Sequence, residues 1–346
     1  LTAQTNASTV DTYNVAVGYN AGKAVTTGAQ NTFIGGLAGA ATTTADANTA
    51  VGYNALNDNT TGTRNVAVGG AALDNSTTAS YNTAVGYEAL TVTTTGANNT
   101  GLGYRALYLN TTGADNTAVG KGALTANTTG ASNTVVGGSA GAAITTGIRN
   151  VCIGQKACND TVLLTTGGGN VVIGYEARTA AAGTSNTIVM GNNVTGQADD
   201  NFTFGTGATD SNIAFGATSI TAPSDVRLKE DIQDEEVGLG FINDLRPVTF
   251  QWKKEKDIPE EMKAHVAGSE KRTMNGKHNH GFIAQEVKAV IDNHNMKDGF
   301  DMWTEDGADG RQRIGDASLM PIMVKALQEL SEKNDALEAR LAALEA

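Results

Sequence analysis

The chain has 346 residues and a formal net charge of −12, with 24 Lys and Arg against 36 Asp and Glu. This acidic balance argues against a nucleic-acid groove, and no apolar run approaches the roughly 18 residues that a membrane-spanning helix needs. Residues 1–222 hold 7 basic and 11 acidic residues, whereas residues 223–346 hold 17 and 25 and every Pro, His and Trp. We therefore expect a domain boundary next to Pro223.

An Asn-led motif of five residues, typified by NTAVG, recurs through the first two thirds of the chain. From Asn14 to Asn150 it occurs nine times, and every step between neighbours is 17 residues. The spacing then becomes irregular, with two further copies and two shorter echoes that begin at Asn170, Asn186, Asn201 and Asn212. Such a period predicts a solenoid in which each repeat forms one coil and packs only on its neighbours.

The residue types of the repeat favour β-structure. Thr, Val and Ile suit pleated strands, Gly allows tight corners, and Asn, Thr and Gly are poor helix formers. We expect the residues three and eight positions after each Asn, mostly Val or Ile and often Leu, to point inward with Ala between them. The repeated Asn should stack as a ladder of side-chain hydrogen bonds. Eleven coils would make a rod of about 50 Å, whose thin core should need the association of several chains.

Cys152 and Cys158 occupy positions that other repeats fill with Ala and Leu. Two cysteines do not define a disulfide framework. We therefore interpret both as small apolar core residues rather than as a redox or metal site.

The repeat is similar to the stalk and head repeats of trimeric bacterial adhesins and of bacteriophage tail fibres. The resemblance covers about residues 10–216 and rests on runs such as NTAVGYNAL and NTTG. It implies a trimeric β-solenoid or β-roll rod and says little about a ligand. The Thr-Thr pairs precede Gly and form no regular T-x-T rows, so we interpret them as exposed polar turns rather than as an ice-binding face.

The string SDVRLKEDI, which begins at Ser224, opens the second part of the chain, and GFIAQEV follows from Gly281. The two motifs resemble those of the phage intramolecular chaperone and auto-processing domain found in endosialidase tailspikes and other tail fibres. The resemblance covers about residues 224–346. It implies a small α+β domain that assembles a homotrimer and then releases itself by cleavage.

In that family the serine and lysine of the first motif form a proteolytic dyad, which corresponds here to Ser224 and Lys229. A serine hydroxyl needs an adjacent base, and a lysine can serve when burial or cationic neighbours keep it neutral. Arg227 is one such cation, or an anchor for the fold. A spacing of five puts the two side chains on opposite faces of a strand and about 140° apart on a helix. The dyad therefore requires a sharp turn or a lysine from another subunit.

The cleaved bond should adjoin Ser224. Attack on the Pro223 carbonyl by Ser224 of the same chain passes through a five-membered ring, which favours the Pro223–Ser224 bond. If Ser224 of a neighbouring chain attacks instead, the Ser224–Asp225 bond is a second candidate for cleavage. The alternative without catalysis is that the motif only begins the domain as a turn and strand.

Other candidate residues of this domain are weaker. Gln285 and Glu286 either line the cleavage pocket or pack and cap a helix. His278 and His280 lack a nearby third ligand, so we interpret them as surface or packing residues and expect neither metal nor cofactor.

The C-terminal residues 319–346 predict a coiled-coil helix. Apolar residues follow alternating steps of three and four, with Asn334 at one a position. The seam comprises Met320, Met323, Leu327, Leu330, Asn334, Leu337, Leu341 and Leu344. A buried Asn often favours dimers, so the expected trimer rests on the resemblance.

The sequence thus predicts a mainly β rod over residues 1–222, a self-cleaving chaperone domain over 223–318 and a trimeric coiled coil over 319–346. The resemblance implies a virion protein of the phage tail that joins upstream tail or baseplate proteins and attaches to a host-cell receptor, a glycan or surface protein. Alternatives are a bacterial trimeric surface adhesin and a trimerisation clamp that is never cleaved.

Overall fold

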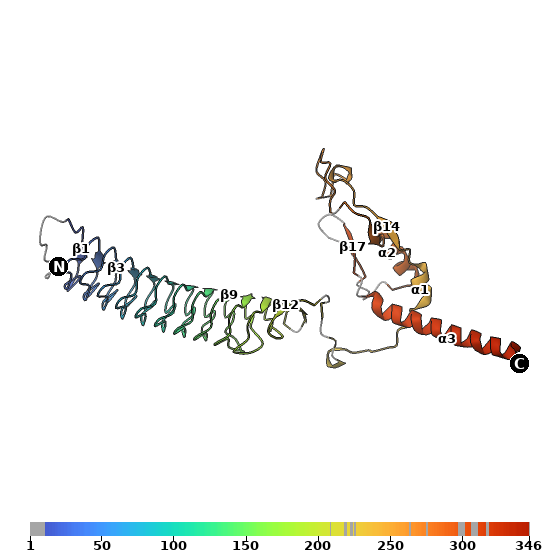
Figure 1. Cartoon of the computed structure of the whole chain (residues 1–346), viewed down its shortest axis with the longest axis horizontal. Helices are drawn as coiled ribbons and strands as arrows, with labels where there is room; N and C mark the ends of the chain where they lie inside the picture. The colour runs from blue at the N-terminus through green and yellow to red at the C-terminus, as the bar shows by residue number, and fades with distance from the viewer. Residues whose placement is uncertain are drawn as a thin grey trace. The chain divides into compact units, whose positions relative to one another are not determined.

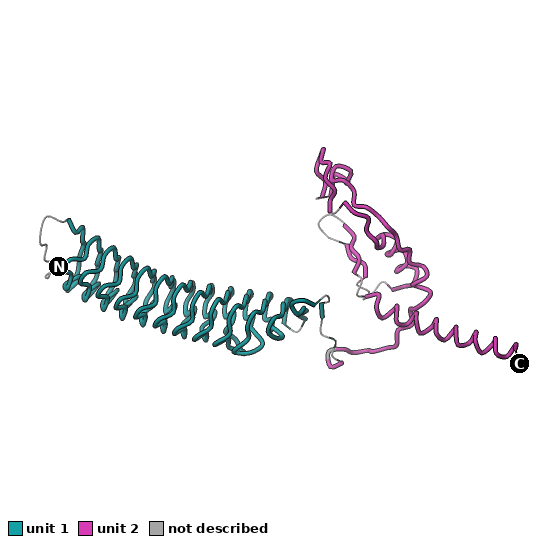
Figure 2. Tube along the Cα trace, viewed as in Figure 1, with its two compact units in different colours: residues 1–225 teal, residues 226–346 magenta. Residues whose placement is uncertain are grey.

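The computed structural model describes residues 11–207, 209–217, 220–221, 224, 226–262, 264–274, 276–296, 302–305, 311–315 and 318–345. The chain forms two compact units, Leu1–Asp225 and Val226–Ala346 (Figure 2). Within the described residues, no helix is both long and apolar enough to span a membrane.

The first unit is a β-solenoid in which each coil contributes one short strand (Figure 1). The strands stack in sequence order as one sheet, parallel from β1 to β12, and β13 closes it by pairing with β12 in the antiparallel sense. The strands are β1 (Val15–Val17), β2 (Thr32–Ile34), β3 (Thr49–Val51), β4 (Val66–Val68), β5 (Thr83–Val85), β6 (Thr100–Leu102), β7 (Thr117–Val119), β8 (Thr134–Val136), β9 (Val151–Ile153), β10 (Val171–Ile173), β11 (Ile188–Asn192), β12 (Asn201–Thr206) and β13 (Thr209–Ala214). This confirms the predicted fold class of the rod.

The repeated Asn forms the predicted ladder inside the solenoid. In the third coil the side-chain amide of Asn48 donates to the carbonyl of Gly62 (2.9 Å), and its Oδ1 accepts the backbone N–H of Asn65 in the next coil (2.9 Å). Asn48 and Asn65 are fully buried. Each buried amide is therefore satisfied by its neighbours, which holds successive coils in one register.

The prediction for the position three residues after the Asn is wrong in the coils that begin at Asn14 to Asn170 and holds only for Val189, whereas the one for the eighth position is confirmed. In the third coil Ala50, Ala55 and Leu56 are fully buried, whereas Val51 is only half-buried. Because the Asn itself points inward, strand alternation turns the second residue inward and the first and third outward. A prediction from hydrophobicity alone therefore places the wrong side of the strand in the core.

Each of the strands β1–β10 is followed directly by a glycine with positive φ, which no other residue can replace without strain. Gly52 has φ +140°, and a Cβ there would lie 2.5 Å from the carbonyl oxygen of Gly69 in the next coil. The backbones of successive coils approach so closely that only glycine fits.

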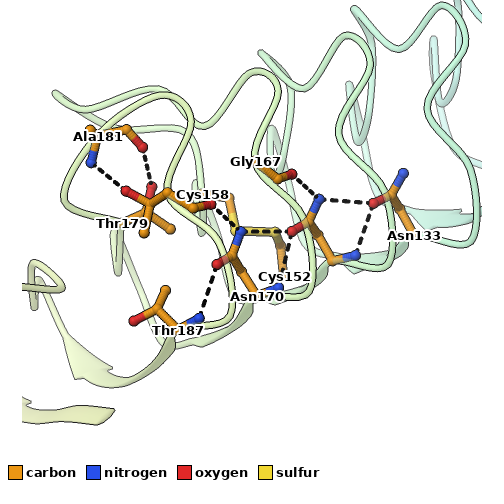
Figure 3. The surroundings of a disulfide bond; sticks show 10 residues. Asn133, Cys152, Cys158, Gly167, Asn170, Thr179, Ala181 and Thr187 are labelled. Carbon is orange, nitrogen blue, oxygen red and sulfur yellow. Dashed lines mark hydrogen bonds between the residues drawn. A yellow bond between two sulfur atoms is a disulfide. The ribbon is translucent and has the colours of Figure 1, made fainter. Parts of the chain in front are cut away.

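Cys152 and Cys158 form a disulfide, with 6.0 Å between their Cα atoms, which corrects the expectation of two unbonded core residues (Figure 3). Both are fully buried, as expected. They occupy the second and eighth positions after Asn150, the inward positions that Ala50 and Leu56 fill in the third coil. Two cysteines at these positions are brought together inside one coil.

The ladder changes register in the last coils. Three extra residues lie between Asn150 and Asn170, yet Val171 still pairs with Val151. In the next coil the ladder position is occupied by Thr187 rather than by the expected Asn186. The backbone N–H of Thr187 donates to Oδ1 of Asn170 (3.2 Å). Ile188 consequently pairs with Val171, which places Asn186 before the strand rather than in the ladder.

The second unit is a small α+β region followed by a long helix (Figure 1). Its elements are η1 (Val226–Leu228), α1 (Leu239–Asp244), β14 (Val248–Phe250), η2 (Glu255–Asp257), β15 (Asn279–Gly281), α2 (Ala284–Asn293), β16 (Trp303–Glu305), β17 (Gln312–Ile314) and α3 (Leu319–Glu345). β14 pairs with β15, and β16 with β17, both antiparallel. The core joins α1, α2 and the start of α3 through Phe241, Leu245, Val287, Ile291, Met302, Leu319 and Ile322.

Candidate functional site

The two predicted dyad residues flank a short turn. Ser224 is exposed, and Lys229 is exposed directly after η1. The backbone N–H of Lys229 donates to the carbonyl of Val226 (3.1 Å), and Arg227 is an exposed residue of the same turn. The chain between the two residues is therefore a turn rather than a straight strand. Pro223 and Asp225, the predicted neighbours of the cleaved bond, lie outside the described residues.

Glu286 of the second motif makes a two-pronged ion pair with Arg246. Arg246 Nε donates to Glu286 Oε2 (2.9 Å), and Arg246 Nη2 donates to Glu286 Oε1. The hydrogen bonds from Arg246 lower the pKa of the Glu286 carboxyl. This pair connects the first turn of α2 to the segment between α1 and β14.

The rest of the GFIAQEV motif divides between core and surface. Val287 belongs to the core and Phe282 packs against it, whereas Gln285 is exposed. The described contacts of the motif therefore position α2 within the domain. The role of Gln285 and Glu286 beside the cleaved bond stays a prediction.

The two histidines before this motif have separate surroundings. His280 lies on β15 opposite Thr249, and His278 Nδ1 lies 3.4 Å from Nε2 of Gln251. Across the described part of the chain, no three His, Cys, Asp or Glu residues are grouped to hold a metal ion.

Helix α3 has two different faces. One face, at the start of the helix, packs into the domain core through Leu319, Ile322 and Ala326. The predicted seam lies elsewhere and is exposed: Leu327 has 63 % and Leu337 has 60 % of its surface accessible, and Met320, Met323, Leu330, Leu341 and Leu344 are also exposed. Asn334 is exposed as well, and its amide donates to Oε1 of Glu338 (3.1 Å).

The length of this apolar seam is what singles it out. Residues 331–345 of α3 are all exposed in the single chain. An exposed leucine row at heptad spacing, which no other part of the same chain covers, is typical of a helix that forms a coiled coil with partner helices. The seam is the clearest interaction surface of the second unit.

A further contact between α3 and the domain comes from Glu329, a residue that sequence reasoning missed. Oε2 of Glu329 accepts the backbone N–H of Leu239 at the first residue of α1 (2.9 Å). A carboxylate at a helix N-terminus satisfies an unpaired amide and interacts favourably with the helix dipole. Glu329 is 90 residues away in sequence, so no local pattern could have identified this contact.

A second missed cluster lies on the surface of the domain. Lys254 and Lys256 both pair with Glu270. Hydrogen bonds from Lys254 and then Lys256 lower the pKa of Glu270 to about 2. The cluster bridges the segment around η2 to the chain near Glu270.

The comparison with protein families bears on the second unit. Residues 224–296 match the family model of the chaperone of endosialidase, which is also named as a peptidase family. The match begins at Ser224 and ends before α3. No curated protein and no solved structure matches the chain. A chaperone domain of this family, joined to a β-solenoid, fits an intramolecular chaperone for assembly of a trimeric rod.

Proposed function

We propose that this chain is a fibre subunit whose second unit drives assembly of a homotrimer and then cleaves itself from the rod. The exposed leucine seam of α3 carries the proposal, because it lies apart from the face that packs into the domain. The family match at residues 224–296 supports a trimeric chaperone and a peptidase activity.

Assembly of this rod requires a device that sets register. Successive coils differ little in sequence, and a slip of one coil moves a rod by only about 4.8 Å. Slipped trimers would therefore have nearly the same contact energy as the aligned one. Three α3 helices joined in parallel would bring three chains together at one defined end.

We assign the cleavage to Ser224 as nucleophile and Lys229 as base. Lys229 takes the hydroxyl proton while Oγ attacks the carbonyl of residue 223. The C–N bond then breaks, the proton passes to the departing nitrogen, and an ester joins the two parts. Water hydrolyses this ester and leaves a carboxylate on residue 223 and the free hydroxyl of Ser224.

The exposure of both side chains makes cleavage conditional on assembly. A lysine acts as a base only when neutral, and burial favours the neutral amine. In the single chain Lys229 is exposed, so neighbouring copies would have to supply the burial. Cleavage would then follow correct trimerisation and release the chaperone. The rod that remains would serve in host attachment as part of a phage tail.

The test is intact mass and denaturing electrophoresis of the wild type, Ser224→Ala and Lys229→Ala. We expect two fragments from the wild type alone, and their masses identify the cleaved bond. A wild-type trimer that stays whole would instead indicate a retained clamp and refute the proteolytic assignment. A wild type that sediments as a monomer would refute the chaperone proposal.

A further inference from the structure

The outer face of the solenoid sheet is uncharged and carries one continuous apolar row. Strands β1–β11 contain no charged residue and no proline. Their outward positions hold Thr, Val or Ile at the first place after the ladder residue and larger apolar residues at the third. This third row comprises Val17, Ile34, Val51, Val68, Val85, Leu102, Val119, Val136, Ile153, Ile173 and Met190.

Several members of the third row are well exposed in the single chain. Accessible fractions are 57 % for Val17, 40 % for Ile34, 43 % for Leu102 and 41 % for Met190. Eleven strands in register extend this row over about 50 Å. An exposed apolar row of this length is uncommon on a protein that stays monomeric.

We infer that this strand face is the surface on which three copies of the solenoid pack on one another. The inference rests on the proposed trimer and adds the contact between the rods to the contact between the α3 helices. The occupant of the face is therefore another copy of this chain, aligned so that equivalent coils lie at the same height.

Charge favours this face over the others. Residues 1–222 carry 7 basic and 11 acidic residues, so three identical rods repel one another overall. Charged side chains lie beyond the two ends of the strands rather than on them. Glu88, Arg105 and Lys156 follow the glycine after a strand, and Arg64, Asp115 and Arg149 directly precede the ladder Asn. Identical coils at one height can meet through the strand face without bringing like charges together.

The area that the face offers lies at the lower end of the range of specific interfaces. A fully exposed Val, Leu or Ile side chain presents roughly 60–120 Å² of apolar surface. Six members of the third row are exposed to about two-fifths or more and the other five are half-buried. The row therefore offers at most on the order of 400 Å² per chain, and the smaller outward row adds roughly half as much again. The total, on the order of 600 Å² per chain, corresponds to the lower end of the roughly 1,200–2,000 Å² that two partners bury together in a specific interface.

Cysteine accessibility tests the inference in the full chain. Leu102→Cys probes the strand face, and Thr112→Cys is the matched control, because Thr112 is an exposed corner residue of the same coil. Both are made with Cys152→Ala and Cys158→Leu, which remove the native disulfide so that the introduced cysteine cannot exchange with it. Ser224→Ala keeps the chain whole. Maleimide labelling is then compared between this chain and a version that also carries Leu330→Asp and Leu337→Asp.

We expect residue 102 to label at least about tenfold more slowly in the trimer than in the α3 variant, because a covered side chain reacts only after local opening. Residue 112 should label at one rate in both. Equal rates at residue 102, in a sample whose sedimentation mass is trimeric, would overturn the inference, leave the α3 proposal standing and leave the face open to another partner. A monomeric parent would overturn both.

A second test uses two variants that keep the native disulfide, so that its removal cannot affect the result. Val85→Lys with Val119→Lys places charges on the strand face, and Thr95→Lys with Thr112→Lys places them on exposed corners. We expect only the strand-face pair to lower the heat stability of the trimer. Equal stability of the two pairs would contradict the inference.

Discussion

In the second coil of the solenoid, the large and the small inward-facing side chains have exchanged positions relative to the third coil. Five successive coils, from the third to the seventh, have a small residue at the second position after the Asn and Leu at the eighth, such as Ala50 and Leu56. The second coil has Phe33 and Gly39 instead, and a Cβ on Gly39 would lie only 2.4 Å from the Phe33 ring. Phe33 therefore fills the space that a leucine occupies in the neighbouring coil.

This exchange predicts strong compensation between two substitutions. Phe33→Ala alone should cost about 3–5 kcal/mol because it leaves a cavity. Gly39→Leu alone should cost about 1–3 kcal/mol because the core is overpacked. The backbone tolerates leucine there, since Leu56 has φ 55° and Gly39 has φ 58°. The double variant loses a net two heavy atoms from the coil, so it should cost only about 1–2 kcal/mol.

Native-state hydrogen exchange measures this effect coil by coil. We expect the opening free energy of the amides in β2 and β3 to fall in each single variant and to recover in the double variant. The amides of β9 serve as an internal control, because distant coils should be unaffected. A cost in the double variant equal to the sum of the two single costs, about 4–8 kcal/mol, would refute the exchange of volume.

Three further predictions concern the other features of the chain. Replacement of the disulfide by Cys152→Ala and Cys158→Leu should lower the opening free energy of the ninth coil by about 2 kcal/mol, because closing a loop of this size costs roughly that much chain entropy. Unchanged hydrogen exchange at the amides of β9 would contradict this prediction. Leu337→Asp should reduce the trimer to monomers in sedimentation at a concentration where Ala339→Asp, on the outer face of α3, leaves it intact; dissociation of both variants would argue against a specific seam. The pKa of Glu270 is lowered to about 2 in the folded chain, so its contribution to stability is present above the ordinary pKa of a glutamate and is lost as the pH falls through 2. A carboxyl titration by NMR should place its midpoint near that value, and a midpoint near 4 would contradict the pairing with Lys254 and Lys256.

Much of the architecture could be predicted from residues that repeat. The 17-residue period indicates one coil per repeat, because identical segments stack most favourably on identical neighbours. The Asn at the head of each repeat predicted the buried ladder, since an amide both donates and accepts. The heptad row from Met320 to Leu344 predicted α3, and the structure shows that row exposed and apart from the packed face.

The candidate site was less accessible to prediction than the rod. Ser224 and Lys229 were selected by resemblance, and the structure adds that η1 turns the chain between them. The pairing of Arg246 with Glu286 and of Glu329 with the start of α1 joins residues that are far apart in sequence. A single sequence contains no local signal for such contacts, because they arise only once helices pack.

The sequence by itself determined the coil length, the ladder and the helical seam, because each depends on periodicity. Only the tertiary structure decided which side of each strand faces inward and that Cys152 and Cys158 are joined. Valine is more hydrophobic than alanine, so hydrophobicity favoured the third position after the Asn. The buried Asn and the glycine corner instead turn the second position inward, and that same geometry brings the two sulfur atoms together.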